Sequence, residues 1–259
     1  MLQEITPKEI FSYDIINLDN VWASYDGKGY VLKDISLSIK GGINFVVIGP
    51  SGSGKTTLLK IINGLVRPSK GRVRVFSVEA GNNGHFKKLM PKIGYIPQNL
   101  GLVKNMSVMD NVLMGSLHRV GNFRALIKQF PDEEVRSAEE AIKLVGLEDK
   151  HDRKVYMLSG GEKRRVAIAR AFVQKPSLLL ADEIVSELDF VKSREIMDMI
   201  HSVKQKMGIT MVMVHHDLEI ALDYADRIAV MKEGVKVAEF KPDELDRASV
   251  TKLFNGYET

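Results

Sequence analysis

The sequence predicts an α/β fold in which a mostly helical block, about residues 105–160, is inserted into a core built on a parallel sheet. Three observations predict it: short apolar runs of strand length, helical patterns between those runs, and a middle third without strand patterns. The length of 259 residues, with 44% hydrophobic and 27% charged residues, suits one globular domain. We therefore expect a single domain over 1–259, with its core at about 16–104 and 161–240 and a C-terminal tail at 241–259.

The first third of the chain contains most of the strand patterns. In Ile35–Ile39 the isoleucine and leucine side chains face one way and Ser36 and Ser38 the other, which is typical of a half-buried strand. A helix over Thr56–Asn63 is expected to end at Gly64. The expected strands are Ile16–Tyr25, Ile35–Ile39, the apolar run Ile43–Ile48, and Arg72–Phe76.

The rest of the chain is helical at first and then alternates. Ser107 and Asp110 resemble a capping box at the start of a helix that is expected to run to about His118. Residues 119–131 show no clear pattern, and a second helix is expected to start at Pro131 and to end at Gly146. Helices and strands then alternate in the order Glu162–Val173, Leu178–Ala181, Val191–Lys206, Ile209–Val214, Leu218–Ala225 and Ile228–Met231. This alternation favours a parallel sheet with helical crossovers.

Composition excludes several classes of protein. There is no cysteine, so disulfides and thiolate chemistry are excluded. The net charge of +4 does not indicate a nucleic-acid partner, and we expect the short basic clusters Lys87-Lys88 and Lys163-Arg164-Arg165 to lie on solvated faces. No apolar run reaches the roughly 18–20 residues of a membrane span, and the N-terminus does not resemble a signal peptide. We expect a cytoplasmic protein whose membrane role, if it has one, comes through a partner.

The segment Gly49–Thr56 matches the pattern G-x-x-x-x-G-K-[ST] of a P-loop, and it lies between an apolar strand and a helical pattern. Its backbone N–H groups and the helix N-terminus can hold phosphates, Lys55 can reach the β- and γ-phosphates, and the Thr56 hydroxyl can ligate Mg²⁺. The residues predicted to bind a nucleoside triphosphate here are Gly49, Pro50, Ser51, Gly52, Ser53, Gly54, Lys55, Thr56 and Thr57.

Two carboxylates follow the buried-strand pattern Leu178–Ala181. Asp182 at the strand end can hold the Mg²⁺ shell, and Glu183 is placed to orient a water for attack on the γ-phosphate. An acidic pair after a strand is weak evidence alone, but the P-loop about 130 residues upstream strengthens it.

The segment Leu158–Glu162, with Ser159, Gly160 and Gly161, resembles the signature motif of ATP-binding cassette (ABC) ATPases. The serine and glycines before an amphipathic helix can form a second anion-binding helix N-terminus. The resemblance covers about residues 16–240. It implies a P-loop NTPase (RecA-like) core with an antiparallel β subdomain and an inserted α-helical subdomain, with ATP and Mg²⁺ as cofactors.

The same resemblance assigns further positions. Gln98 is similar to the Q-loop glutamine, which senses Mg²⁺ and the attacking water, and Ser186–Asp189 to the D-loop. His216 is similar to the switch histidine that contacts the γ-phosphate, with His215 as its neighbour and a His-His-Asp metal site as the rival. Tyr25 is similar to the aromatic that stacks on adenine, and Tyr30 is the second choice.

Some motifs resemble one subfamily of ABC ATPases, and three positions differ from the usual family pattern. Motifs such as Asn99–Val103 and Asp223–Arg227 are similar to the ATP-binding subunit of phosphonate importers. Ile184 stands where the family usually has proline after the catalytic glutamate, and the loss of proline should loosen that turn. Glu187 stands where the D-loop commonly has a small or neutral residue, and Glu162 replaces the commoner glutamine after the signature glycines.

The resemblance implies an ATPase in which Lys55, Gln98, Glu183 and His216 act on ATP held between two copies of the chain packed head to tail. It implies membrane permease subunits as partners, together with a substrate-binding protein if the system is an importer, and a place on the inner face of the membrane. The alternatives are an exporter or lipoprotein-release ATPase, a DNA-repair or translation ATPase, and a regulator that does not hydrolyse ATP.

Overall fold

The computed structural model describes residues 13–80, 83–120, 129–186 and 188–244 and has the predicted α/β class. Two compact units make it up. The sheet unit contains the described residues up to Met90, Leu180–Glu183 and the described residues from Lys204 onward. The helical unit contains Pro91–Leu179 and the described part of Ile184–Val203.

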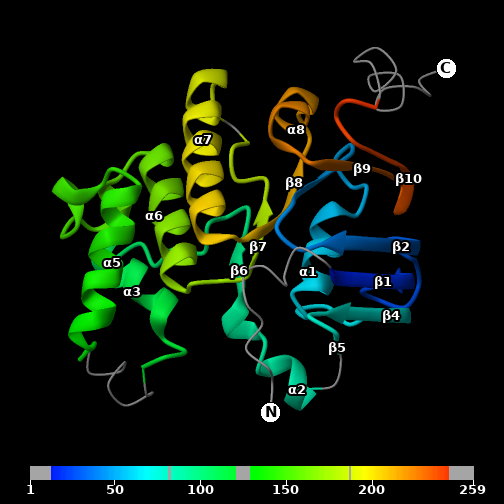
Figure 1. Ribbon diagram of the computed structural model, residues 1–259, viewed down its shortest axis with the longest axis horizontal. Helices are drawn as coiled ribbons and strands as arrows, with labels where there is room; N and C mark the ends of the chain where they lie inside the picture. The colour runs from blue at the N-terminus through cyan, green and yellow to red at the C-terminus, as the bar shows by residue number, and fades with distance from the viewer. Residues whose placement is uncertain (1–12, 81–82, 121–128, 187, 245–259) are drawn as a thin grey trace. The chain divides into compact units, whose positions relative to one another are not determined.

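An antiparallel sheet in the order β2-β1-β4-β5 forms one layer of the sheet unit (Figure 1). In β2, Ile35, Leu37 and Ile39 are buried while Ser36 and Ser38 are exposed, so the predicted alternation is confirmed. The strands are β1 (Asp14–Ala23), β2 (Leu32–Lys40), β4 (Lys70–Val75) and β5 (Val78–Glu79).

The second sheet is mainly parallel and has the strand order β10-β9-β3-β8-β7-β6, of which β6 and the first two residues of β7 belong to the helical unit. Strand β3 pairs in parallel with β8 and β9, and β10 is an antiparallel edge. Every residue of β3, β7 and β8 is buried, which is why these strands read as unbroken apolar runs. The strands are β3 (Asn44–Ile48), β7 (Leu178–Asp182), β8 (Thr210–His215), β9 (Arg227–Lys232) and β10 (Val235–Phe240).

The parallel register brings the ends of β3 and β8 together. Ile48 is the partner of His215, so the loops that leave these two strands start at the same edge of the sheet. Helix α1 (Lys55–Ile62) follows β3, and α8 (Leu218–Tyr224) follows β8. The short helix α2 (Asn83–Lys87) also belongs to the sheet unit.

In the helical unit α3, α5 and α6 pack against one another (Figure 1). Acidic residues in the first turn of α5 suit the positive end of a helix, and Gly146, with φ of 66°, follows its end as predicted. The elements are β6 (Ile93–Ile96), α3 (Val108–Leu113), α5 (Asp132–Leu144), α6 (Gly160–Val173) and α7 (Phe190–Met207), with short 3-10 turns η2 (Met90–Lys92), η3 (Met114–Ser116), η4 (Glu148–Lys150) and η5 (Val155–Met157). Met90 of η2 and the last four residues of α7 belong to the sheet unit.

The helix expected from Ser107 to about His118 is shorter than predicted. Ser107 caps α3 by accepting a hydrogen bond from the backbone N–H of Asp110, but the α-helix ends at Leu113 and continues as the 3-10 turn η3. Within η3 the hydroxyl of Ser116 donates to the carbonyl of Leu113, an alternative to regular helix bonding. Strands β5, β6 and β10 were not predicted from the sequence. Residues 121–128 lie outside the described part of the chain.

The helical unit contains more of the sequence than the expected block of about 105–160. One reason is that α6, which follows that block, packs on α3 and α5. The subdomain boundaries inferred from the sequence stay a prediction. In the part of the chain that the structure describes, no helix combines the length and the apolar character needed to cross a membrane.

Candidate nucleotide-binding site

The P-loop connects β3 to α1 at the edge where parallel strands end. Gly54 is the N-cap of α1 and has φ of 98°. A Cβ atom at this position would lie 2.6 Å from Cδ2 of Leu32 and 3.0 Å from the carbonyl oxygen of Val31. Any other residue at this position would have a strained backbone, and its Cβ atom would collide with Leu32 and Val31, so the loop needs glycine here. The loop is therefore free to turn its N–H groups toward a phosphate.

Lys55 is the first residue of α1, and its side chain is only 5% exposed. Its Nζ donates hydrogen bonds to the carbonyl oxygens of Gly49 and Pro50, at 2.8 and 3.0 Å. Burial lowers the pKa of Lys55, while the nearby carboxylates of Glu183 and Asp182 oppose that shift. The hydroxyl of Ser53 in the same loop is buried and has no hydrogen-bond partner among the described residues. Both groups suit a phosphate ligand.

Thr56 and Asp182 meet across 126 residues of sequence. The Thr56 hydroxyl donates to Oδ1 of Asp182 at 3.0 Å, and Asp182 is the last residue of β7 and is 2% exposed. A hydroxyl and a carboxylate are the hard oxygen ligands that Mg²⁺ prefers. The residues present therefore fit the predicted magnesium site.

Glu183 lies between two basic side chains. Its Oε1 is 3.9 Å from Nζ of Lys55, and its Oε2 is 3.8 Å from Nδ1 of His216. Its backbone N–H donates to the carbonyl of Val214 at 3.1 Å, which ties the residue after β7 to β8. The carboxylate is 16% exposed, so a water can reach it.

The two histidines after β8 have different surroundings. The side chain of His216 is 51% exposed and faces Glu183, whereas His215 is 3% exposed. The two rings stack with centroids 4.9 Å apart. His215 Nδ1 accepts a hydrogen bond from the backbone N–H of Asp217, and burial, followed by the neighbouring His216, lowers the pKa of His215.

A metal site at these histidines has no support. The side chain of Asp217 caps α8 by accepting hydrogen bonds from the N–H groups of Glu219 and Ile220. Among the described residues, no group of three or more histidine, aspartate and glutamate side chains could hold a metal ion. The geometry favours His216, rather than His215, as the residue that reaches a nucleotide.

The two candidate adenine-stacking residues also differ. The side chain of Tyr25 is 60% exposed, and its hydroxyl lies 3.2 Å from Oγ1 of Thr57 on α1. Tyr30 packs edge to face on Trp22, with ring centroids 4.9 Å apart, and Nζ of Lys70 lies over its ring. Tyr25 is therefore the ring that a base could stack on beside the P-loop.

The second glycine-containing loop lies in the helical unit, at the N-terminus of α6. Ser159 forms a full capping box: its hydroxyl accepts from the N–H of Glu162, and its own N–H donates to Oε2 of Glu162 at 2.7 Å. Lys150 Nζ donates to the other carboxylate oxygen of Glu162 at 2.6 Å. Hydrogen bonds from Lys150 and from the N–H of Ser159 lower the pKa of Glu162 to about 2.

The expectation that Lys163-Arg164-Arg165 forms a solvated face is wrong for the two arginines. Arg164 donates to the carbonyl oxygens of Ile184 and Ser186, and Arg165 donates to the carbonyl of Val145. Guanidinium groups can bond buried carbonyls and keep their charge, so a basic cluster on a helix need not be solvated. Arg164 and Lys150 are candidate functional residues that sequence reasoning missed, because no local pattern records their distant partners.

The remaining predicted residues are placed as follows. Gln98 is exposed just after β6, and the Asp189 carboxylate caps α7 by accepting from the N–H of Lys192. Glu187 lies outside the described residues. Within the sheet unit the structure brings together Lys55, Thr56, Asp182, Glu183 and His216. Gln98, Ser159, Gly160 and Gly161 belong to the helical unit, and their action on the same nucleotide stays a prediction.

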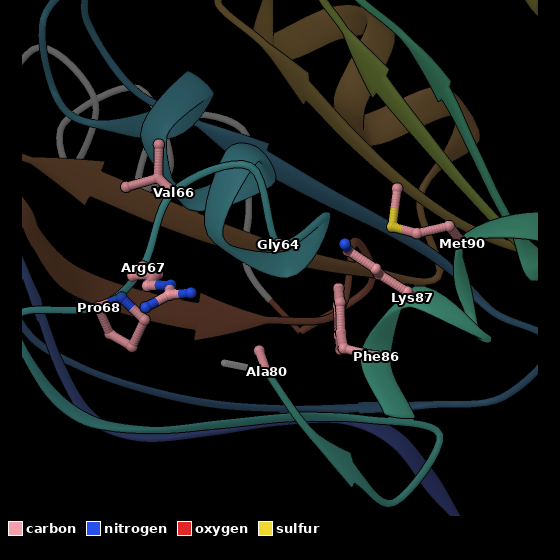
Figure 2. Close-up of a pocket in the computed structure, with 8 residues that line it drawn as sticks. All are labelled: Gly64, Val66, Arg67, Pro68, Ala80, Phe86, Lys87 and Met90. Atoms are coloured by element: carbon pink, nitrogen blue, oxygen red, sulfur yellow. The ribbon is translucent and has the colours of Figure 1, made fainter. Parts of the chain in front are cut away.

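A pocket at the other end of α1 lies apart from these residues. Figure 2 shows the Phe86 side chain in this pocket with Gly64, where a Cβ atom would come within 2.2 Å of the ring. Its volume is about 130 Å³, and its lining residues are Gly64, Val66, Arg67, Pro68, Ala80, Phe86, Lys87 and Met90. The eight residues of α1 span about 12 Å, so this pocket does not belong to the P-loop.

Comparison with known proteins shows the family to which this chain belongs. Residues 32–186 match the family model described as ABC transporter. The chain is 39% identical over 239 residues to the phosphonates import ATP-binding protein PhnC of Bdellovibrio bacteriovorus, which covers 91% of this chain and 92% of that protein. It is 35% identical over 247 residues to PhnC 2 of Haloarcula marismortui, covering 95% of this chain and 91% of the relative.

Solved structures give the same family. CbiO1 of Clostridium perfringens, part of an ABC transporter complex, superposes with a TM-score of 0.80 at 30% identity, covering 93% of this chain and 95% of that one. The ATP-binding cassette MJ0796, in a dimeric post-hydrolysis state with ADP and phosphate, has a TM-score of 0.76 at 32% identity, covering 88% and 98%. The fold agrees with these likenesses, and the chain belongs to the ABC transporter family as an ATP-hydrolysing subunit.

Proposed function

We propose that this chain binds ATP with Mg²⁺, pairs with a second copy of itself, and powers the import of a phosphonate through a separate membrane permease. The observation that carries the ATPase part is the cluster of Lys55, Thr56, Asp182, Glu183 and His216 at one edge of the parallel sheet. The phosphonate part rests on relatives that cover almost the whole chain and carry that name.

The phosphates would be held by the P-loop. The ammonium of Lys55 donates hydrogen bonds to the carbonyl oxygens of Gly49 and Pro50. Phosphate oxygens are stronger hydrogen-bond acceptors for an ammonium than carbonyl oxygens are. The ammonium of Lys55 would therefore bond to the β- and γ-phosphates in place of these carbonyls. The hydroxyl of Ser53 and the N–H groups at the start of α1 would add donors from the loop.

Thr56 and Asp182 would hold the magnesium ion, and Gln98 is the further predicted ligand. When bound there, Mg²⁺ would neutralise charge on the β- and γ-phosphates. The hydrogen bond between Thr56 and Asp182 keeps the two oxygen donors in place beforehand. The adenine would lie on the exposed ring of Tyr25.

Glu183 would orient the attacking water. The water oxygen bonds to the γ-phosphorus while the bond from that phosphorus to the β–γ bridging oxygen breaks, so ADP and inorganic phosphate leave. Positioning and charge neutralisation supply most of the acceleration in this reaction. Lys55 and His216 lie on either side of the carboxylate and would stabilise the negative charge on the γ-phosphate.

Ser159, Gly160 and Gly161 would act on the ATP of a second copy. Their loop presents a helix N-terminus with a glycine backbone, which suits an anion. A solved relative at 32% identity is dimeric, which supports a pair for this chain. Head-to-tail packing would give two equal sites, each with a P-loop from one copy and the Ser159 loop from the other.

The membrane part of the system would be a separate permease, which would hold this chain at the inner face of the membrane. The relatives cited above carry importer names, so an exporter or lipoprotein-release role has no support from them. An importer would also take its cargo from a substrate-binding protein.

The Glu183→Gln variant tests the ATPase and the pair. It should lose about 100-fold or more in turnover, because an amide orients water less well than a carboxylate. With ATP it should migrate as a dimer in size-exclusion chromatography with light scattering, and with ADP as a monomer. Adding Ser159→Arg should abolish the dimer. A Glu183→Gln chain that stays monomeric in saturating ATP and Mg²⁺ would contradict the pair.

Reconstitution tests the cargo. A permease that co-purifies with this chain, together with its substrate-binding protein, would be placed in vesicles that enclose ATP and this subunit. Methylphosphonate should stimulate ATP hydrolysis, and inorganic phosphate at the same concentration should not. Equal stimulation by both, or none by either, would overturn the phosphonate assignment without affecting the ATPase.

A further inference from the structure

The turn after Glu183 begins with an unfavourable backbone conformation. Glu183 has φ of 49°, in the left-handed region that residues other than glycine rarely adopt. Such a conformation persists only where the surrounding structure holds it. The next residue is Ile184, which unlike proline leaves its own φ free. The direction of the Glu183 carboxylate therefore depends on what holds the turn.

Arg164 of α6 holds this turn by two hydrogen bonds. Its Nε donates to the carbonyl oxygen of Ile184 at 2.9 Å, and its Nη2 donates to the carbonyl oxygen of Ser186. Two donors of one planar guanidinium thus fix two peptide groups that lie two residues apart. Bonds from a charged donor are stronger than those between neutral groups.

The turn is also held by burial. The side chains of Ile184 and Val185 are 1% and 2% exposed, and the hydroxyl of Ser193 on α7 donates to the carbonyl of Val185. Burial fixes the side chains, whereas Arg164 fixes the outer carbonyl groups on each side of Val185. The two restraints act on different parts of the same turn.

We propose that Arg164 is a positioning residue for catalysis: it holds the main chain directly after Glu183 and so fixes where that carboxylate points. The two hydrogen bonds of Arg164 are made to the main chain after Glu183 and not to the carboxylate itself. Its effect reaches the reaction through the covalent link from Ile184 to Glu183.

The same arginine connects two functional segments, and this step rests on the proposed function. Arg164 lies one turn into α6, whose N-cap is Ser159. In the proposed pair, Ser159 of one copy grips the ATP bound by the other. If α6 shifts when Ser159 contacts the partner's ATP, Arg164 would move with the helix. The turn after Glu183 of the same copy would then move as well. Each copy would thereby adjust its own carboxylate to the nucleotide state of the partner's site.

The test compares Arg164→Ala and Arg164→Lys with Arg136→Ala, an exposed arginine of α5 in the same unit. In the chain without nucleotide, hydrogen exchange of the backbone amides in 183–189 should be about tenfold faster in Arg164→Ala and unchanged in Arg136→Ala. Lysine keeps the charge but has no fork of donors, so Arg164→Lys should fall between them.

Kinetics separate positioning from general damage. In Arg164→Ala kcat should fall about 10- to 100-fold while KM for ATP and the Tm stay near those of the parent chain. The Arg164→Ala change made in the Glu183→Gln chain should still allow the ATP-dependent dimer. Unchanged exchange of 183–189, unchanged kcat, or a joint loss of kcat, ATP affinity and Tm would each overturn the proposal. If the parent chain neither hydrolyses ATP nor dimerises, the proposed function fails, and the exchange measurement still decides whether Arg164 holds the turn.

Discussion

The hydroxyl of Thr56 donates a 3.0 Å hydrogen bond to Oδ1 of Asp182, which joins the start of α1 to the end of β7. Both oxygens lie at the edge of the sheet where β3 and β8 end, beside Lys55 and Glu183. Two oxygen ligands that already touch need little rearrangement to bind a cation, which is the basis of preorganised binding.

Thr56→Val should therefore raise the Mg²⁺ concentration needed for half-maximal ATP hydrolysis, by about tenfold, because valine keeps the shape of threonine but lacks the hydroxyl. Thr56→Ser keeps the hydroxyl and should stay near the parent value. The measurement is phosphate release against Mg²⁺ concentration at saturating ATP. Equal Mg²⁺ dependence of the valine and serine variants would remove Thr56 from the metal site.

Tyr25→Ala should raise KM for ATP several-fold, about 1 kcal/mol of lost stacking, whereas Tyr25→Phe should not. Tyr30→Ala is the matched comparison. Because Tyr30 packs on Trp22, this substitution should lower Tm more than it raises KM for ATP. The measurements are ATP titrations of hydrolysis and thermal unfolding of the three variants. A larger effect on KM at Tyr30 than at Tyr25 would reverse the assignment.

The pair of Lys150 and Glu162 should make stability depend on pH. The pKa of Glu162 is lowered to about 2, so its stabilising effect is complete above pH 4.5 and is lost as the pH falls from 4.5 toward 2. The group is partly exposed, and solvent screening limits the effect at pH 7 to about 1 kcal/mol.

Urea unfolding between pH 7 and 3 checks this effect. Glu162→Gln should be less stable than the parent chain at pH 7, and the difference should shrink toward pH 3. Lys150→Met removes the main cause and should bring the pKa of Glu162 back toward its ordinary value. A difference that does not change with pH would mean that the charge of Glu162 contributes nothing to stability.

Gly115→Ala should destabilise the helical unit by about 1–3 kcal/mol, because a Cβ atom there would lie 2.2 Å from the backbone oxygen of Arg170. Gly161→Ala is the control for folding, since no atom lies within 4 Å of its added methyl group. It should leave Tm unchanged or higher, yet weaken the ATP-dependent dimer of the Glu183→Gln chain. A Gly115→Ala chain as stable as the parent would show that η3 can move away from α6 at no cost.

Local patterns in the sequence were enough to predict much of the fold. The alternation in β2 and the apolar runs of β3, β7 and β8 reflect which faces are buried, and burial follows from side-chain type. Gly64 and Gly146 end helices as predicted, because left-handed backbone there depends on the residue itself. The short strands β5, β6 and β10 were missed, since two to six residues at sheet edges carry little periodic signal.

The sequence by itself determined the chemistry of the site: a loop with the spacing of a phosphate cradle, a strand that ends in two carboxylates, and a second glycine-containing loop before a helix. Only the tertiary structure decided which neighbours those groups have. It exposed Tyr25 and His216 and buried His215, and it gave Arg164 and Lys150 partners that lie far from them in the sequence. The physical reason is that a hydrogen bond such as that of Thr56 to Asp182 closes a loop of 126 residues, and no local pattern can record it.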